Sequence, residues 1–422
     1  METKKRIVGI VVGGGPAPGI NGVISSVTIE ACNNGWSVIG FLDGYKHLVG
    51  GNPQIMPLEI GDVSRIHHRG GSLLRTSRTN PSKDPQKLKM VVESLLKLGV
   101  TDLVSIGGDD TAFTAYRVSK FAREERQADI RVVHVPKTID NDLPLPEGIP
   151  TFGYETARQV GSTIVQNLAE DARTTGRWFL VVAMGRKAGH LALGIGTAAG
   201  ATLIIIPEEF PGPVRLSTVA DIVATSMLKR MDQGRNYGIV VLAEGLLEKM
   251  EPSDFEGLKE VPRDEFGHML LSEVKFGMIV KHQVERRLAE MGVKIRIVDH
   301  VVGYEVRCAN PIAFDIEYAR HLGYGAVELL KNNKTNVLVS VQENHIVPIP
   351  FDQMMDPATG KTEVRMVNIS SIHYRIARKY MIRLERQDME DAAVLGRLAR
   401  LARLEPEEFR RRFESVVRPE TI

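Results

Sequence analysis

The chain has 422 residues, too many for one simple hydrophobic core, so two domains are the default expectation. Its 43% hydrophobic and 25% charged residues are typical of a soluble globular protein, and a net charge of +2 excludes a strong overall attraction to nucleic acid or to a membrane. The sequence has two cysteines without paired spacing, which predicts neither disulfides nor a zinc site. The amino terminus is charged and leads into no signal-peptide core, and no apolar run is long enough for a membrane span. These features predict a cytoplasmic protein.

The chain is predicted to begin with a buried strand over 7–12, followed by a glycine-rich loop. That loop, Gly13-Gly14-Gly15-Pro16-Ala17-Pro18-Gly19, lets the backbone approach a ligand closely. A helix over 20–33 follows and ends at Asn34-Gly35, and a second strand covers 37–42.

A connection over 50–62 that contains glycine and proline then leads to a basic loop. Arg69, Arg75 and Arg78 lie in this loop among small residues and could line a phosphate pocket through forked hydrogen bonds. A solvated basic loop is the alternative, and the residues alone leave that choice open.

A helix is predicted to begin at Asp84-Pro85 and to end at Gly99. The strand over 102–106 that follows is, like the strand over 7–12, succeeded by glycines. It runs into Gly107-Gly108-Asp109-Asp110-Thr111, where a helix over 111–125 begins. Adjacent carboxylates at a helix entrance suit a hard divalent cation that arrives with phosphate oxygens. Simple helix capping is the alternative, because Asp and Thr are good caps.

A third strand, over 131–135, is predicted to stop at Pro136, which has no N–H to give to a sheet. The segment Lys137-Thr138-Ile139-Asp140-Asn141-Asp142 then crowds two carboxylates, a hydroxyl and an ammonium together. Like charges at this spacing cost free energy unless a metal, a cation or a substrate proton offsets them. A polar turn before the next helix is the alternative, but three such strand exits together favour a ligand site.

A second run of strands and helices follows a helix over about 154–173. Strand 177–183 leads to Met184-Gly185-Arg186, and strand 237–243 precedes Glu244. The remaining predicted elements are a strand over 201–206, a helix near 217–231, a helix over 311–331 and a strand over 336–342. Such alternation indicates parallel sheets covered by helices on both faces.

The tail from Glu385 onward carries leucines and arginines at helical spacing: Leu395, Leu398, Leu401 and Leu404 beside Arg397, Arg400 and Arg403. A basic amphipathic helix can bind a membrane surface. A helix packed on its own protein or on another subunit is the favoured interpretation.

Three of these segments resemble the phosphofructokinase family. Gly107-Gly108-Asp109, Thr138-Ile139-Asp140-Asn141-Asp142 and Met184-Gly185-Arg186 occur in the order and spacing of that family, and the likeness covers roughly residues 6–350. The resemblance implies an α/β fold with two Rossmann-like, doubly wound domains of mainly parallel sheet, an active site in the cleft between them, and a helical C-terminal extension.

The same resemblance implies how the chain is divided. Residues 1–150 with about 305–350 would form the domain of the phosphoryl donor and Mg²⁺. Residues 151–304 with about 351–384 would form the sugar-phosphate domain, and 385–422 would form the extension.

The donor is indicated by two residues. Nucleotide-dependent bacterial members of the family typically have glycine where this chain has Asp110 and Lys137, so the chain resembles the branch that uses inorganic pyrophosphate. A carboxylate at Asp110 would lie where the α-phosphate of a nucleotide should sit, and would repel it. Lys137 would add a positive charge beside the transferred phosphoryl group. Because some ATP-using relatives share the lysine, Asp110 is the deciding residue.

The resemblance implies reversible, Mg²⁺-dependent phosphoryl transfer from pyrophosphate to the C1 hydroxyl of fructose 6-phosphate, a reaction of glycolysis. Asp140 matches the general base of the family, and Lys137, Thr138 and Asp110 complete the expected catalytic set. Gly14 and Gly15, together with Lys137, would bind pyrophosphate. Asp109 and Asp142 would hold the metal.

Fructose 6-phosphate would be bound by residues that match the family at other positions: Thr138, Asp140, Arg177, Met184, Gly185, Arg186, Glu244, Tyr304 and Arg307. Tyr304 and Arg307 resemble the clamp on the 6-phosphate, although many relatives have His at the position of Tyr304. Arg177 resembles an arginine that reaches the site of a neighbouring subunit, which implies a homodimer or homotetramer. A second such arginine of the family is missing, since the chain reads Val298-Asp299-His300 there.

Three other functions fit the residues less well. An ATP-dependent phosphofructokinase is disfavoured by Asp110, and a non-catalytic regulatory subunit is disfavoured because the carboxylates at 109, 140 and 142 are all present. A dinucleotide-dependent dehydrogenase is weaker still, because no strand is followed by a Gly-x-Gly-x-x-Gly fingerprint.

Overall fold

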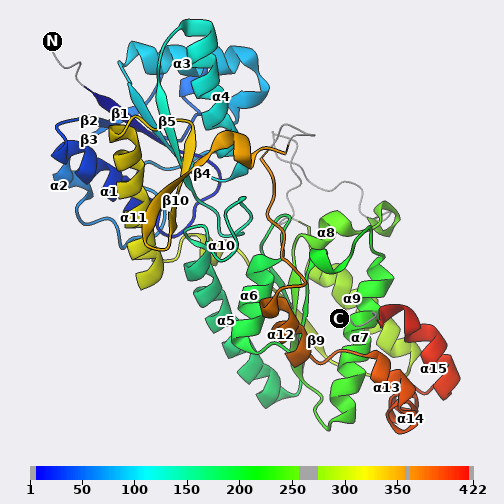
Figure 1. Cartoon of the computed structure of the whole chain (residues 1–422). Helices are drawn as coiled ribbons and strands as arrows, with labels where there is room; N and C mark the ends of the chain where they lie inside the picture. Colours follow the sequence, from blue (N-terminus) through cyan, green and yellow to red (C-terminus); the bar gives the residue numbers. More distant parts are fainter. Residues whose placement is uncertain (1–5, 256–273, 357–361, 418–422) are drawn as a thin grey trace. The chain divides into compact units, whose positions relative to one another are not determined.

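The computed structural model describes residues 6–255, 274–356 and 362–417, and the chain forms two compact units (Figure 1). The first unit comprises Met1–Ala157 and Tyr304–Arg365, and the second comprises Arg158–Gly303 and Met366–Ile422. The sequence predicts the last crossing near residue 350. In the structure, residues up to Arg365 belong to the first unit, because Arg365 hydrogen-bonds to the loop that follows residue 140.

A seven-stranded sheet forms the centre of the first unit, in the order β11-β10-β5-β4-β1-β2-β3. Its five inner strands are parallel, whereas β3 and β11 run antiparallel at the two edges. The strands are β1 (Ile7–Val12), β2 (Ser37–Phe41), β3 (Ile55–Leu58), β4 (Asp102–Gly107), β5 (Arg131–Pro136), β10 (Val337–Gln342) and β11 (His345–Pro350).

Helices cover both faces of this sheet because the side chains of its inner strands alternate between two apolar cores. On β1, Val8, Ile10 and Val12 enter the core beneath α1 and α11, whereas Val11 enters the core beneath α3 and α4. The helices of this unit are α1 (Ile20–Asn33), α2 (Ile60–Val63), α3 (Pro85–Lys97), α4 (Asp109–Arg126), α10 (Tyr304–Arg307) and α11 (Ala313–Lys331).

The order of the strands reverses at β1, which has β2 on one side and β4 on the other. In an open parallel sheet such a reversal leaves a crevice at the carboxyl ends of the strands, where ligands bind. The glycine-rich loop follows β1 at this edge, and Gly108-Asp109-Asp110 follows β4.

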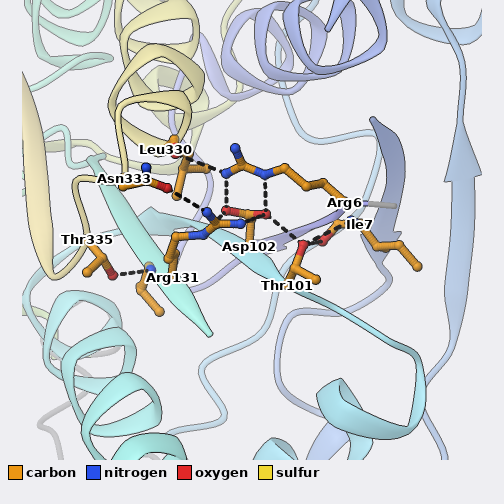
Figure 2. Close-up of polar contacts among 9 residues, drawn as sticks. Arg6, Ile7, Thr101, Asp102, Arg131, Leu330, Asn333 and Thr335 are labelled. Carbon is orange, nitrogen blue, oxygen red and sulfur yellow. Dashed lines mark hydrogen bonds and ion pairs between the residues drawn. The ribbon is translucent and has the colours of Figure 1, made fainter. Parts of the chain in front are cut away.

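A cluster of charged side chains lies at the amino ends of the strands, opposite the carboxyl ends where a ligand would bind (Figure 2). The fully buried carboxylate of Asp102 accepts hydrogen bonds from Arg6 at 2.6 Å and from Arg131 at 3.0 Å. Arg6 also lies over the ring of Trp36, with its guanidinium carbon 3.6 Å from the ring centroid. Because Arg6 directly precedes β1 and Arg131 begins β5, the cluster links the amino ends of strands β1, β4 and β5, far from the candidate ligand edge.

The second unit is built on a parallel four-stranded sheet in the order β7-β8-β6-β9. Its strands are β6 (Trp178–Ala183), β7 (Leu203–Ile205), β8 (Gly238–Ala243) and β9 (Ile297–Val302). The helices before the tail are α5 (Tyr154–Thr175, which starts in the first unit), α6 (His190–Ala199), α7 (Leu216–Asp232), α8 (Leu246–Lys249) and α9 (Phe276–Glu290).

The C-terminal tail packs on this second unit. It forms α12 (Ile372–Tyr380), α13 (Arg386–Glu390), α14 (Ala392–Leu401) and α15 (Pro406–Phe413). Arg397 of α14 pairs with Asp232 at the end of α7 at 3.0 Å, and Phe409 and Phe413 of α15 are fully buried. The predicted leucine stripe is divided, because α14 ends at Leu401 and Arg403 then takes a positive φ of 54°.

Two details of the sequence prediction are wrong. The strand β5 ends at Pro136 as predicted, but Pro136 belongs to it: it pairs with Gly107, and the N–H of Lys137 then donates to the Gly107 carbonyl at 2.9 Å. Residues 55–58 form an edge strand inside the predicted connection. Among the described residues, no helix combines the length and apolar character that crossing a bilayer requires.

Candidate active site

The glycine-rich loop after β1 is packed against two cationic side chains. Gly14 has a φ of 80°, which favours glycine, and a Cβ there would lie 3.2 Å from the ammonium nitrogen of Lys137. A Cβ on Gly15 would lie 1.7 Å from a guanidinium nitrogen of Arg307, so only glycine leaves room for that arginine. Lys137 also donates a hydrogen bond to the carbonyl of Gly15. The loop therefore lies against two cationic side chains, while the N–H groups of Gly13 and Gly14 donate to the carbonyls of Ile106 and Ser77, both at 2.9 Å.

Lys137 is buried, with 4% of its surface exposed. Burial first and the neighbouring Arg307 second lower the pKa of Lys137 to about 7, against the opposing effect of the carboxylates of Asp140 and Asp109. An anion that arrived beside this ammonium would favour the charged form and raise the pKa again. The side chain is therefore poised to gain a positive charge when an anionic ligand binds.

Arg307 and Arg78 extend this positive group. Burial and the neighbouring Arg78 lower the pKa of Arg307, whereas Asp140 raises it, so the three side chains act on one another. The ring of exposed Tyr304 lies 5.4 Å from the guanidinium carbon of Arg307. Of the basic loop, Arg78 thus joins the site, whereas Arg75 forms a surface ion pair with Asp43 at 3.2 Å.

Asp109 and Asp110 form the first turn of α4, where the positive end of the helix dipole favours carboxylates. The sequence does not predict that Asn80 holds Asp110: its side-chain nitrogen donates to the Asp110 carboxylate at 3.2 Å. The orientation of Asn80 is fixed because its oxygen accepts from the N–H of Ser82 at 3.0 Å. An Asn directly before Pro81 is a signal for a cap, and Asn80 does cap the turn that follows.

The loop after β5 has a defined shape. The hydroxyl of Thr138 accepts from the N–H of Asp140 at 3.0 Å, and the hydroxyl of Thr151 donates to the Thr138 carbonyl at 2.7 Å. Asn141 lies between the two predicted acidic residues and takes a left-handed φ of 56°, which Asn tolerates better than most residues. Asp142 is buried, with 9% of its surface exposed.

His134 links the carboxyl ends of β5 and β4, directly before the loops that follow these strands. Burial lowers the pKa of His134 to about 3, so its ring is neutral. One ring nitrogen then donates to the Gly107 carbonyl at 2.9 Å, and the other faces the Ser105 hydroxyl at 3.3 Å. The sequence offers no signal for this role beyond a histidine in an apolar strand.

The second unit brings together part of the predicted sugar site. Met184-Gly185-Arg186 follows β6 and Glu244 follows β8, so both lie at the carboxyl edge of the second sheet. The N–H of Gly185, whose φ is 148°, donates to the buried Glu244 carboxylate at 3.2 Å. Arg177 precedes β6 and pairs with Asp171 at 3.5 Å, so it lies at the opposite end of that strand and does not join them.

The predicted site residues are thus distributed over both units. The first unit holds Gly14, Gly15, Asp109, Asp110, Lys137, Thr138, Asp140, Asp142, Tyr304 and Arg307, and the second holds Arg177, Met184, Gly185, Arg186 and Glu244.

The comparisons with known proteins agree on one family. A family model described as phosphofructokinase matches residues 7–330. The chain is 54% identical over 412 residues to pyrophosphate–fructose 6-phosphate 1-phosphotransferase of Thermotoga maritima, an alignment that covers 96% of this chain and 97% of that one. It is 48% identical over 421 residues to the protein of the same name from Naegleria fowleri, with 97% and 95% covered.

Solved structures share the fold. The crystal structure of pyrophosphate-dependent phosphofructokinase from Marinobacter aquaeolei matches with a TM-score of 0.66, at 20% identity, over 89% of this chain and 90% of that one. At this identity the likeness supports the two-sheet α/β architecture and nothing finer.

Proposed function

Because the chain belongs to the phosphofructokinase family, we propose that it transfers a phosphoryl group from pyrophosphate to the C1 hydroxyl of fructose 6-phosphate. The products are fructose 1,6-bisphosphate and phosphate, and the reaction is reversible. The observation that carries the proposal is the convergence of Lys137 on the glycine loop with the carboxylates of Asp109 and Asp140. Phosphoryl transfer needs this combination of positive charge and a proton acceptor.

In the proposed reaction Asp140 accepts the proton of the C1 hydroxyl. The C1 oxygen then forms a bond to one phosphorus of pyrophosphate, while the bond from that phosphorus to the bridging oxygen breaks and its electron pair leaves with phosphate. Lys137 and the N–H group of Gly15 stabilise the negative charge of the donor, and Thr138 hydrogen-bonds the transferred group. The predicted N–H contact from Gly14 is not retained, because that N–H donates to the Ser77 carbonyl at 2.9 Å.

Asp110 selects the donor in this proposal. Its carboxylate is held in place by Asn80 and would repel the α-phosphate of a nucleotide, whereas pyrophosphate has no such group. The alternative, an ATP-dependent phosphofructokinase, lacks an observation in its favour. A non-catalytic role is likewise disfavoured, since the proton acceptor and both predicted metal carboxylates are retained.

We further propose that Asp109 and Asp142 hold Mg²⁺. Mg²⁺ can be held by one or two carboxylates, with its other ligands from water and substrate phosphate. Mg²⁺ would supply charge neutralisation on the donor.

The contacts to the sugar phosphate are assigned through the likeness to the family. Met184, Gly185, Arg186 and Glu244 would contact the sugar, with Glu244 accepting from its hydroxyls. Tyr304 and Arg307 would bind the 6-phosphate. Arg177 would act in a neighbouring subunit of a homodimer or homotetramer, which is supported by its position away from the other sugar residues of its own unit.

Replacing the proposed base tests this function. Asp140→Asn should lower kcat for pyrophosphate-dependent phosphorylation of fructose 6-phosphate by roughly 10²–10⁴-fold, because the amide cannot accept the proton. The KM for fructose 6-phosphate should change little. Near-normal turnover of the variant would remove Asp140 as the base, and an inactive wild-type protein would refute the proposed reaction itself.

A further inference from the structure

A short return segment, Thr362–Arg365, lies across the loops that carry the predicted acidic residues of the first unit. The hydroxyl of Thr362 donates to the backbone carbonyl of Asp109 at 3.2 Å. Three residues later, the N–H of Arg365 donates to the backbone carbonyl of Asp142 at 2.8 Å. One segment from late in the chain therefore contacts both the loop after β4 and the loop after β5.

The guanidinium of Arg365 is surrounded by acceptors from the loop after β5. Its Nε and one terminal nitrogen donate to the Asn141 carbonyl at 3.1 and 2.9 Å, and that terminal nitrogen also donates to the Asn141 side-chain oxygen at 2.5 Å. The other terminal nitrogen donates to the carbonyls of Leu145, Pro146 and Ile149, at 3.2, 3.2 and 2.8 Å. A single side chain thus joins both ends of this loop.

The loop depends on such a donor because of its own sequence. Pro144 and Pro146 have no N–H groups, which leaves the loop short of backbone donors, although the N–H of Ile149 does donate to the Pro146 carbonyl at 3.1 Å. Asn141 is held in a left-handed conformation, and its side-chain oxygen also accepts from the N–H of Thr151 at 3.0 Å. Arg365 and Thr151 together therefore fix the one residue that separates Asp140 from Asp142.

We propose that Arg365 is a positioning residue for catalysis: by holding Asn141, it sets the directions in which the neighbouring Asp140 and Asp142 side chains project. This inference rests on the proposed function, since it gives Asp140 the role of base. Arg365 acts through the loop and is not assigned a contact with substrate. Its effect should fall on kcat, because a base displaced by about 1 Å can cost roughly 10²-fold in rate.

A merely structural role is the competing explanation, and Arg131 provides a matched control. Like Arg365, it is a half-buried arginine of the first unit, with hydrogen bonds to Asp102 and Asn333 at 3.0 and 2.9 Å. It lies at the amino ends of the strands, on the opposite edge of the same sheet (Figure 2). Loss of Arg131 should therefore destabilise the fold without displacing Asp140.

The experiment compares the wild-type protein with Arg365→Met, Arg365→Ala and Arg131→Met, by steady-state kinetics with pyrophosphate and fructose 6-phosphate and by thermal unfolding. Arg365→Met should lower kcat roughly 10²-fold at temperatures where the protein is folded, with a much smaller change in either KM. Arg131→Met should lower the unfolding temperature but keep kcat within about threefold of wild type.

Chemical rescue separates positioning from stability. Guanidinium ion at millimolar concentration should partly restore kcat of the folded Arg365→Ala variant, because it can occupy the vacated place and donate to the same carbonyls. It should leave Arg131→Met unchanged. Wild-type turnover in folded Arg365→Met, or an equal loss of kcat in Arg131→Met, would overturn the inference. An inactive wild-type protein would instead refute the proposed function.

Discussion

At the scale of single residues, Lys137 is the group whose charge should control donor binding. Burial lowers its pKa to about 7, so in the free protein the ammonium loses its proton as the pH rises above 7. Pyrophosphate favours the charged form, and its binding must then take up a proton. Affinity for the donor therefore falls with rising pH, by up to about tenfold per pH unit.

This pH dependence can be measured against Lys137→Arg, whose guanidinium stays charged over the whole range. The KM for pyrophosphate should rise from pH 7 to pH 9 in the wild-type protein and should rise less steeply in the variant. Because the ionisation of pyrophosphate is the same for both proteins, the difference between the two slopes reports Lys137. Equal slopes would contradict the assignment.

At the scale of secondary structure, a buried ion pair attaches the tail to the second unit. Arg383, between α12 and α13, donates to Glu209 at 2.5 Å, and both side chains are almost fully buried. Glu209→Gln should lower the free energy of unfolding by about 3–5 kcal/mol, because it leaves the arginine charge buried without a partner.

Urea unfolding checks this value. The double variant Glu209→Met with Arg383→Met is the control, because replacing both charges by apolar groups of similar volume should recover most of the loss. A single variant as stable as the wild-type protein would show that the pair does not anchor the tail.

The sequence predicts elements well where the signals are local. The limits of α1 are predicted as observed, because a glycine loop precedes it and Asn34-Gly35 ends it. The edge strands β3 and β11 are missed because both contain prolines and pair antiparallel, without the apolar run of a central strand. The end of β5 is predicted one residue early because the missing N–H of Pro136 excludes a residue from a strand only where that position must donate.

The candidate site is predictable only in part, for the same reason. Its glycines and acidic residues are visible as strand exits, and the family likeness gives them an order. Asn80, His134 and Arg365 are missed because each acts on a residue distant in sequence: Arg365 contacts Asn141 from 224 positions away. Such contacts leave no local pattern.

At the scale of the whole molecule, the proposed role of Arg177 requires more than one subunit. Arg177→Ala should raise the KM for fructose 6-phosphate by roughly 10–100-fold, since it removes one charged contact to the sugar phosphate, and should leave the KM for pyrophosphate nearly unchanged. An effect confined to the donor would refute that role.

Mixing variants tests whether Arg177 acts across subunits. Oligomers reassembled from Arg177→Ala and the inactive Asp140→Asn subunits should regain activity, because some sites then combine an intact Asp140 with an Arg177 from the neighbouring subunit. Mixtures that never exceed the activity of the parent variants would contradict an intersubunit contact.

The central claim concerns the donor, and the most direct measurement compares kcat/KM for pyrophosphate with that for ATP in the purified wild-type protein, with fructose 6-phosphate and Mg²⁺ saturating. We expect rapid turnover with pyrophosphate and little with ATP, and we expect Asp110→Gly to gain activity with ATP, because it removes the repelling carboxylate. Efficient turnover with ATP but none with pyrophosphate would contradict the account.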